Sequence, residues 1–92
     1  MPSLTPAECL AVIPARDEVA TVAEVVRGVR KSLGCRVLVV DDASTDGTAA
    51  AARAAGADTL MLPIGLGAWG ACQAGIRYAA RNGFAGVISL DA

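Results

Sequence analysis

The sequence predicts an α/β fold of three layers, half of a doubly wound parallel sheet with about four strands and three helices. Two observations carry this prediction. Short apolar runs alternate with helical patterns along the chain, and the second and fourth runs are continuous and rich in β-branched residues, as strands buried on both faces are. A strict β-α-β-α-β-α-β order implies parallel strands joined by right-handed crossovers. Ligands of such sheets bind beyond the carboxyl ends of the strands.

The strand candidates are short apolar stretches that end in a proline, a charge or a turn. They are CLAVIP (9–14), CRVLVVD (35–41), ADTLML (57–62) and AGVISLD (85–91).

Three helices are predicted between these strands. The first covers 22–33, with Thr21 and Glu24 as a capping box and Gly34 as its stop. The second covers 45–55 in an alanine-rich stretch, with Ser44 as N-cap and Gly56 as stop, and the third covers 68–81 and ends at Asn82-Gly83.

Size and composition limit the chain to one small domain, residues 1–92. It is 54% hydrophobic and 18% charged, as soluble globular proteins are, and its net charge of −1 with scattered Lys and Arg argues against nucleic acid as a partner. No apolar run has the roughly 18 residues of a membrane span, so we expect a cytoplasmic protein. Cys9, Cys35 and Cys72 lack a C-x-x-C spacing and are predicted to be unpaired core residues.

Charged residues follow the first two strands. PARDE (14–18) puts Arg16, Asp17 and Glu18 into the expected ligand crevice. The same three charges would also suit a solvated loop that leads into a helix, without any ligand. DDASTDGT (41–48) begins with two carboxylates that capping of the next helix does not require. We expect both to point into the loop region, one bracing the loop and the other free to accept hydrogen bonds from a ligand.

GLGAWG (65–70) matches the G-x-G-x-x-G fingerprint of dinucleotide-binding folds, and Asp91 lies 21 residues beyond Gly70, close to where that fingerprint expects an acid. The fingerprint belongs, however, at the first strand-to-helix turn of its sheet. Here two strand-helix units precede it and Pro63 intervenes, so a nicotinamide or flavin protein is disfavoured.

Four motifs in order resemble the N-terminal half of the family-2-type nucleotide-sugar glycosyltransferases, most closely the polyprenyl-phosphate branch typified by dolichyl-phosphate mannose synthase. They cover nearly all of residues 10–92 and read VIPARDEVATVAEVV, VVDDASTDGTAAAARAAGA, LPIGLGAWGACQAGIRYAARNGF and VISLDA. The resemblance implies a Rossmann-like GT-A fold of the nucleotide-diphospho-sugar transferase type, with strand order 3-2-1-4. It puts GLGAWG in the loop entering the third helix, with Gly65 in place of the usual Asn and Trp69 in place of a small residue. We expect Trp69 to fill the core rather than a donor pocket.

The resemblance also implies a donor site. Carried over residue by residue, Pro14, Arg16 and Glu18 would line the base and ribose pocket, and Asp42 would accept a hydrogen bond from the base. Asp91 is also placed among the donor-binding residues, and Asp41 and Gly67 are weaker candidates.

A divalent cation, Mg²⁺ or Mn²⁺, is expected in the full-length enzyme by the same resemblance. Asp91 matches the first acid of the family's Asp-x-Asp, whose last carboxylate binds that cation on the donor diphosphate. The second acid would be residue 93, so the metal ligands of this chain stay unassigned.

The implied activity is inverting transfer of a sugar from a UDP- or GDP-sugar to an acceptor such as a polyprenyl phosphate, which would bring the membrane in only indirectly. The acceptor half with its catalytic base would be absent, so we expect a truncated chain that is inactive alone. Its fourth strand would be an exposed edge, which predicts a homodimer. A non-catalytic nucleotide-binding or oligomerisation module is the alternative. A nucleotidyltransferase is disfavoured because PARDE lacks the glycines of its phosphate loop.

Overall fold

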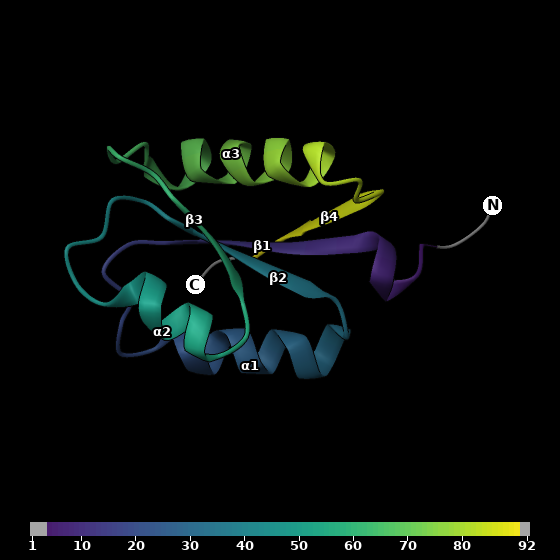
Figure 1. Ribbon diagram of the computed structural model, residues 1–92, viewed down its shortest axis with the longest axis horizontal. Helices are drawn as coiled ribbons and strands as arrows, with labels where there is room; N and C mark the ends of the chain where they lie inside the picture. The colour runs from purple at the N-terminus through teal and green to yellow at the C-terminus, as the bar shows by residue number, and fades with distance from the viewer. Residues whose placement is uncertain (1–3, 91–92) are drawn as a thin grey trace.

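The computed structural model describes residues 4–90 and shows the predicted alternation of strands and helices (Figure 1). The strands are β1 (Cys9–Ala15), β2 (Arg36–Asp41), β3 (Asp58–Met61) and β4 (Gly86–Ser89), and a 3-10 helix, Pro6–Glu8, precedes them. The helices are α1 (Val22–Leu33), α2 (Thr48–Ala54) and α3 (Gly67–Arg81). All strand pairs are parallel and the order is β3-β2-β1-β4, which confirms the predicted topology.

The sheet is covered on both faces, by α1 and α2 on one side and by α3 on the other (Figure 1). Alternate residues of β1 face the two sides: Ala11 and Ile13 join the core under α1 and α2, whereas Leu10 and Val12 join the core under α3. Because both faces are covered, β1 and β2 read in the sequence as continuous apolar runs without polar alternation.

Helix α3 lies close to the sheet because small residues recur one turn apart on its inner face, at Ala71, Gly75 and Ala79. A Cβ atom at position 75 would overlap Val12 Cγ1, far inside van der Waals contact, so glycine is required there.

Two predicted helix caps are wrong. Thr21 makes no cap hydrogen bond to α1, and its hydroxyl instead donates to the carboxylate of Glu18 at 3.1 Å. Helix α2 begins at Thr48 rather than at residue 45, with Gly47 at its N-cap, and Ser44 does not cap it. The Ser44 hydroxyl is used by another loop, as described below.

Two burial predictions also need correction. Trp69 is 78% exposed and does not fill the core. Cys35 is buried as expected, but Cys9 and Cys72 are only half-buried, and all three are free thiols. Among residues 4–90, no helix has both the length and the apolar character needed to cross a bilayer.

Candidate functional site

The loops that follow β1 and β2 are joined by hydrogen bonds at the carboxyl edge of the sheet. The backbone N–H of Asp17 donates to Ser44 Oγ at 2.8 Å, and the N–H of Thr45 donates back to Asp17 Oδ1 at 2.8 Å. The Glu18 N–H donates to the hydroxyl of Thr48, at the start of α2, at 2.9 Å. PARDE and DDASTDGT, distant in the chain, therefore form one unit.

Backbone strain is found in the same two loops. Asp17 has φ of 51° and Ala43 has φ of 59°, and within the described part of the chain they are the non-glycine residues with positive φ. Such a conformation costs on the order of 1–3 kcal/mol for a residue that carries a Cβ. The strained residues follow neighbouring strands at the edge where α/β sheets bind ligands, which supports a functional role for this edge.

Asp42 connects this unit to the loop that follows β3. Its side chain is 4% exposed, and its Oδ1 and Oδ2 accept hydrogen bonds from the N–H groups of Leu66 at 2.7 Å and Gly67 at 2.9 Å. Gly67 has φ of +80°, a conformation that favours glycine. Asp42 thus holds the GLGAWG segment in place.

Asp41 braces its own loop. It is 3% exposed, and its Oδ1 accepts a hydrogen bond from the Ser44 N–H at 3.0 Å. The expected division into one bracing and one wholly free carboxylate is wrong, because Asp41 and Asp42 are both buried and both accept backbone hydrogen bonds. Charge-assisted bonds of this kind offset the cost of burying a carboxylate, which the sequence argument did not include.

The remaining predicted residues lie around this network. Pro14 is half-buried in β1, Glu18 is half-buried, and Arg16 is exposed. The guanidinium of Arg16 lies against Gly65, where an added Cβ would come within 2.9 Å of its nitrogen. Residues from three loops therefore meet at this edge, which we call the carboxyl-edge site, and Asp91 lies outside the described residues.

Thr48 completes a short polar relay in the site. Its fully buried hydroxyl accepts from the Glu18 N–H and donates to Asp46 Oδ1. This side-chain hydrogen bond is the main cause that lowers the pKa of Asp46 from its ordinary value. Asp46 also accepts from the Thr48 N–H at 2.9 Å, so it stabilises the start of α2 in place of Ser44.

Sequence reasoning missed Thr48 and interpreted Ser44 as a helix cap, and it placed Asp17 in the ligand crevice without assigning it a role. These three residues carry the contacts between the β1 and β2 loops, across 27 to 30 positions of sequence. No pattern in the sequence predicts the positive φ of Asp17. The run of hydroxyl and carboxylate residues after Asp42 was the available signal, and it was interpreted as local helix capping.

The described residues do not fit a divalent cation site. Within residues 4–90, no group of three or more His, Cys, Asp or Glu side chains is placed to hold a metal ion. Both oxygens of Asp42 already accept backbone hydrogen bonds.

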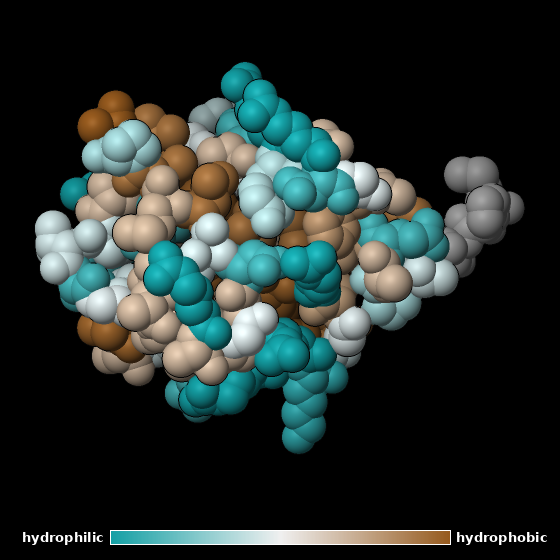
Figure 2. All heavy atoms as spheres, viewed as in Figure 1, coloured by the Kyte–Doolittle hydropathy of each residue, from teal (hydrophilic) through white to brown (hydrophobic). Residues whose placement is uncertain are grey.

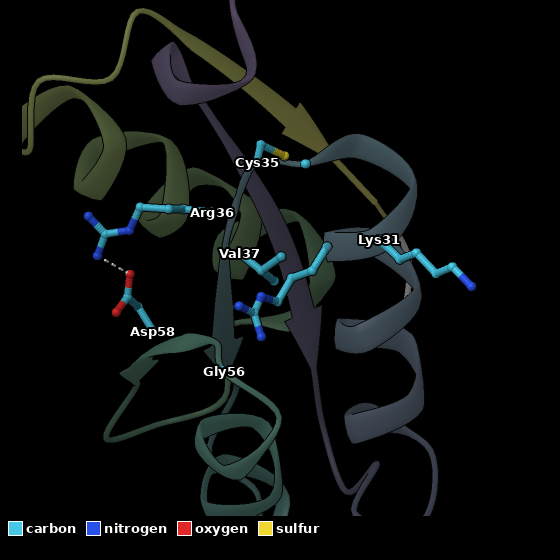
Figure 3. Close-up of a pocket in the computed structure, with 8 residues that line it drawn as sticks. Lys31, Cys35, Arg36, Val37, Gly56 and Asp58 are labelled. Atoms are coloured by element: carbon cyan, nitrogen blue, oxygen red, sulfur yellow. Dashed lines mark hydrogen bonds and ion pairs between the residues drawn. The ribbon is translucent and has the colours of Figure 1, made fainter.

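A hollow of about 620 Å³ lies at the opposite end of the sheet, where β2 and β3 begin (Figure 3). Arg30 lines it and donates to the Ala55 carbonyl at the end of α2 at 3.0 Å. Lys31 points away from the Arg36–Asp58 pair (Figure 3). Helices α1 and α2 both end here, and cations stabilise helix C-termini. We assign these cations a structural role, because ligands of such sheets bind at the other edge.

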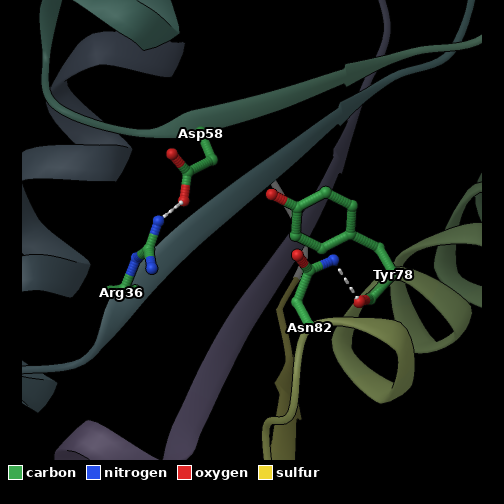
Figure 4. Close-up of polar contacts among 4 residues, drawn as sticks. All are labelled: Arg36, Asp58, Tyr78 and Asn82. Atoms are coloured by element: carbon green, nitrogen blue, oxygen red, sulfur yellow. Dashed lines mark hydrogen bonds and ion pairs between the residues drawn. The ribbon is translucent and has the colours of Figure 1, made fainter.

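A second hollow of about 440 Å³ lies between α3 and β3. Its wall includes Tyr78, whose carbonyl accepts from the Asn82 side chain at 2.8 Å (Figure 4). Figure 4 also shows the exposed ion pair between Arg36 and Asp58, 2.6 Å apart. This hollow contains none of the predicted site residues.

Comparisons with known proteins agree with this architecture. The family described as Glycosyl transferase family 2 matches residues 10–92. Mannosyl-3-phosphoglycerate synthase from Rubrobacter xylanophilus is 31% identical with a TM-score of 0.50, over 58% of this chain and 18% of that one. A structure described only as a mycobacterial protein is 30% identical with a TM-score of 0.63, over 86% of this chain and 32% of that one. No curated protein sequence gives a significant match.

Proposed function

This chain belongs to glycosyl transferase family 2, and we propose that its carboxyl-edge site binds the nucleotide of a UDP- or GDP-sugar donor. One observation carries the proposal: the loops after β1, β2 and β3 are tied together by side-chain hydrogen bonds at the edge where α/β sheets bind ligands. The sequence motifs that resemble the family's donor site supply the residues of this network.

The roles follow from exposure and contacts. Arg16 is exposed beside Gly65 and free to approach the donor, while Pro14 and Glu18 form the half-buried wall against which a base and ribose would lie. Asp42 holds the GLGAWG segment. A carboxylate has about four lone-pair sites, so Asp42 retains acceptor capacity for a base N–H beside its two loop hydrogen bonds.

The proposed reaction is inverting sugar transfer, in which an acceptor oxygen attacks the anomeric carbon and the bond to the nucleotide diphosphate breaks. A polyprenyl phosphate is the proposed acceptor because the sequence motifs resemble the polyprenyl-phosphate branch most closely, and its phosphate oxygen would need no base to activate it. The chain spans 18% and 32% of the two similar structures. We therefore propose that these 92 residues are the donor-binding portion of the enzyme and do not turn over alone.

No step of this proposal runs through Mg²⁺ or Mn²⁺. Residues 4–90 offer no site for this cation. It therefore stays an expectation for the full-length enzyme only.

We also propose that two copies associate through β4. Within residues 4–90, this strand pairs with β1 alone and lies at the edge of the sheet, and its Val87 is 37% exposed. Unpaired edge strands favour association. Light scattering should show a dimer, whereas a monomer at millimolar concentration would contradict this assembly.

Calorimetric titration with UDP and GDP tests the donor proposal. We expect saturable binding of one nucleotide and a loss on the order of tenfold in Arg16→Ala, which equals about 1.4 kcal/mol. Arg81→Ala is the matched control, because Arg81 is exposed at the far end of α3. Absence of binding by either nucleotide, or an equal loss in both variants, would overturn the proposal.

A further inference from the structure

Gly65 lies in the loop between β3 and α3, and its backbone φ does not require a glycine. Within residues 4–90, the glycines with positive φ are Gly34, Gly56, Gly67 and Gly83. Position 65 therefore lacks the left-handed conformation that favours glycine over other residues. The reason for a glycine at this position must lie in the space around it.

The end of the Arg16 side chain occupies that space. A Cβ added at position 65 would lie 2.9 Å from Arg16 Nη1 and 3.5 Å from its Cζ, and these are the two nearest atoms. The first separation is shorter than a real Cβ contact, so the guanidinium would have to move. Arg16 is exposed and its side chain is long and flexible, so it can move without disturbing the core.

The backbone is held on both sides of this contact. Asp17, next to Arg16, donates its N–H to the loop after β2 at 2.8 Å. Leu66, next to Gly65, donates its N–H to the Asp42 carboxylate at 2.7 Å. The Arg16 side chain is therefore the part of the contact that can turn, and the size of residue 65 decides where it lies.

The position of Arg16 matters because this edge of the sheet is acidic. The loops after β1, β2 and β3, residues 15–21, 41–47 and 61–66, contain one basic residue, Arg16. They contain five acidic residues: Asp17, Glu18, Asp41, Asp42 and Asp46. The loop between β3 and α3 adds no charge, and Figure 2 shows hydrophobic residues gathered at the upper left, where Figure 1 places this loop. Among these loops, an anionic nucleotide meets an opposite charge at Arg16 alone.

We propose that Gly65 is a positioning residue for nucleotide binding. Because it has no side chain, the Arg16 guanidinium lies across the gap between the β1 and β3 loops, where it offsets the acidic edge and attracts the phosphates of the donor. A cation that is already in place loses less conformational entropy when the nucleotide binds. This inference rests on the donor site proposed above and deepens it, because Gly65 acts through Arg16.

Gly65→Ala adds one methyl group at the contact and tests this role. Calorimetric titration should show that the affinity for UDP or GDP falls on the order of fivefold, less than the tenfold loss expected for Arg16→Ala. The midpoint of thermal unfolding should not fall, because only an exposed side chain moves. In the Arg16→Ala background, Gly65→Ala should cause no further loss of affinity. Gly28→Ala is the matched control, since it adds the same methyl group in open space on α1 and should bind as the parent does.

The Arg16 side chain can also be followed without any nucleotide. Its Nε–Hε signal in an NMR spectrum is identified by its absence from the spectrum of Arg16→Ala. Gly65→Ala should shift this signal, because the added methyl group displaces the guanidinium. Gly28→Ala should leave it unchanged.

Three results would contradict the role of Gly65. The first is an Arg16 signal that Gly65→Ala leaves in place, and the second is an unchanged affinity in that variant. The third is an equal loss of affinity with and without Arg16, which would show that residue 65 acts on the nucleotide independently. If the parent binds neither nucleotide, the donor proposal fails, and the Arg16 signal still decides whether Gly65 places the guanidinium.

Discussion

Replacing Asp42 by Asn tests how the carboxyl-edge site is held together. The change keeps the size of the side chain and one carbonyl oxygen, but it places an amide NH₂ where the second oxygen accepts a backbone hydrogen bond. One of the two N–H groups, from Leu66 or Gly67, then loses its acceptor. The remaining bond becomes neutral and weaker.

The expected cost follows from the geometry. A hydrogen bond to a charged group contributes about 1.5–3 kcal/mol, and water recovers part of this because Leu66 is 51% exposed. We therefore expect the free energy of unfolding to fall by about 1–2 kcal/mol, which lowers the Tm of a domain of this size by about 4–16 °C.

Urea unfolding followed by far-UV circular dichroism measures this loss, and hydrogen exchange at the Leu66 and Gly67 amides locates it. Asp58→Asn is the matched control, because it breaks an exposed ion pair to Arg36 and should cost at most about 1 kcal/mol. Asp42→Asn within about 0.5 kcal/mol of the parent, the range of ordinary surface changes, would refute the bracing role of Asp42, and so would unchanged amide exchange.

Three further predictions follow from packing and charge. Thr48→Val removes the hydroxyl between the Glu18 N–H and Asp46, and urea unfolding should show a loss of about 1–3 kcal/mol. Hydrogen bonding to the Thr48 side chain lowers the pKa of Asp46 in the folded state. The stabilisation from Asp46 is therefore full above its unfolded pKa of about 3.9 and is lost as the pH falls through the lower folded pKa. Asp46→Asn should remove this part of the acid unfolding transition, and an unaltered transition would contradict the role of Asp46. Gly75→Val should lower the free energy of unfolding by about 1–3 kcal/mol, because the added side chain overlaps Val12 of β1. Gly28→Ala, which adds a methyl group in open space on α1, should raise it by about 0.5–1 kcal/mol in thermal unfolding.

The sequence was sufficient for the order and type of the elements. The apolar, β-branched run from Val37 to Val40 forms the buried strand β2 as predicted, and Gly34, the predicted stop of α1, ends that helix with φ of 66°. Such signals are local, because they depend on periodicity and on the conformational preference of single residues.

The candidate site was predictable only in outline. The strand ends showed where it would lie, but the contacts of Asp42 reach residues 24 and 25 positions away, and no local pattern encodes them. Ser44 and Thr21 carry ordinary capping signals, but Ser44 instead accepts a tertiary hydrogen bond from the Asp17 N–H, and Thr21 donates locally to Glu18. Trp69 was misplaced because apolar character favours burial without requiring it, and much of any protein surface is apolar.

An amide-resolved NMR titration of this chain with UDP, GDP and NADH, each with and without Mg²⁺, tests the central claim most directly. Donor binding at the carboxyl-edge site predicts that UDP or GDP shifts the amides of Glu18, Asp42 and Gly67, while those of Arg36 and Asp58 at the far end of the sheet stay unchanged. Shifts confined to the far end, shifts with NADH alone, or a dispersed spectrum that no nucleotide changes would contradict it.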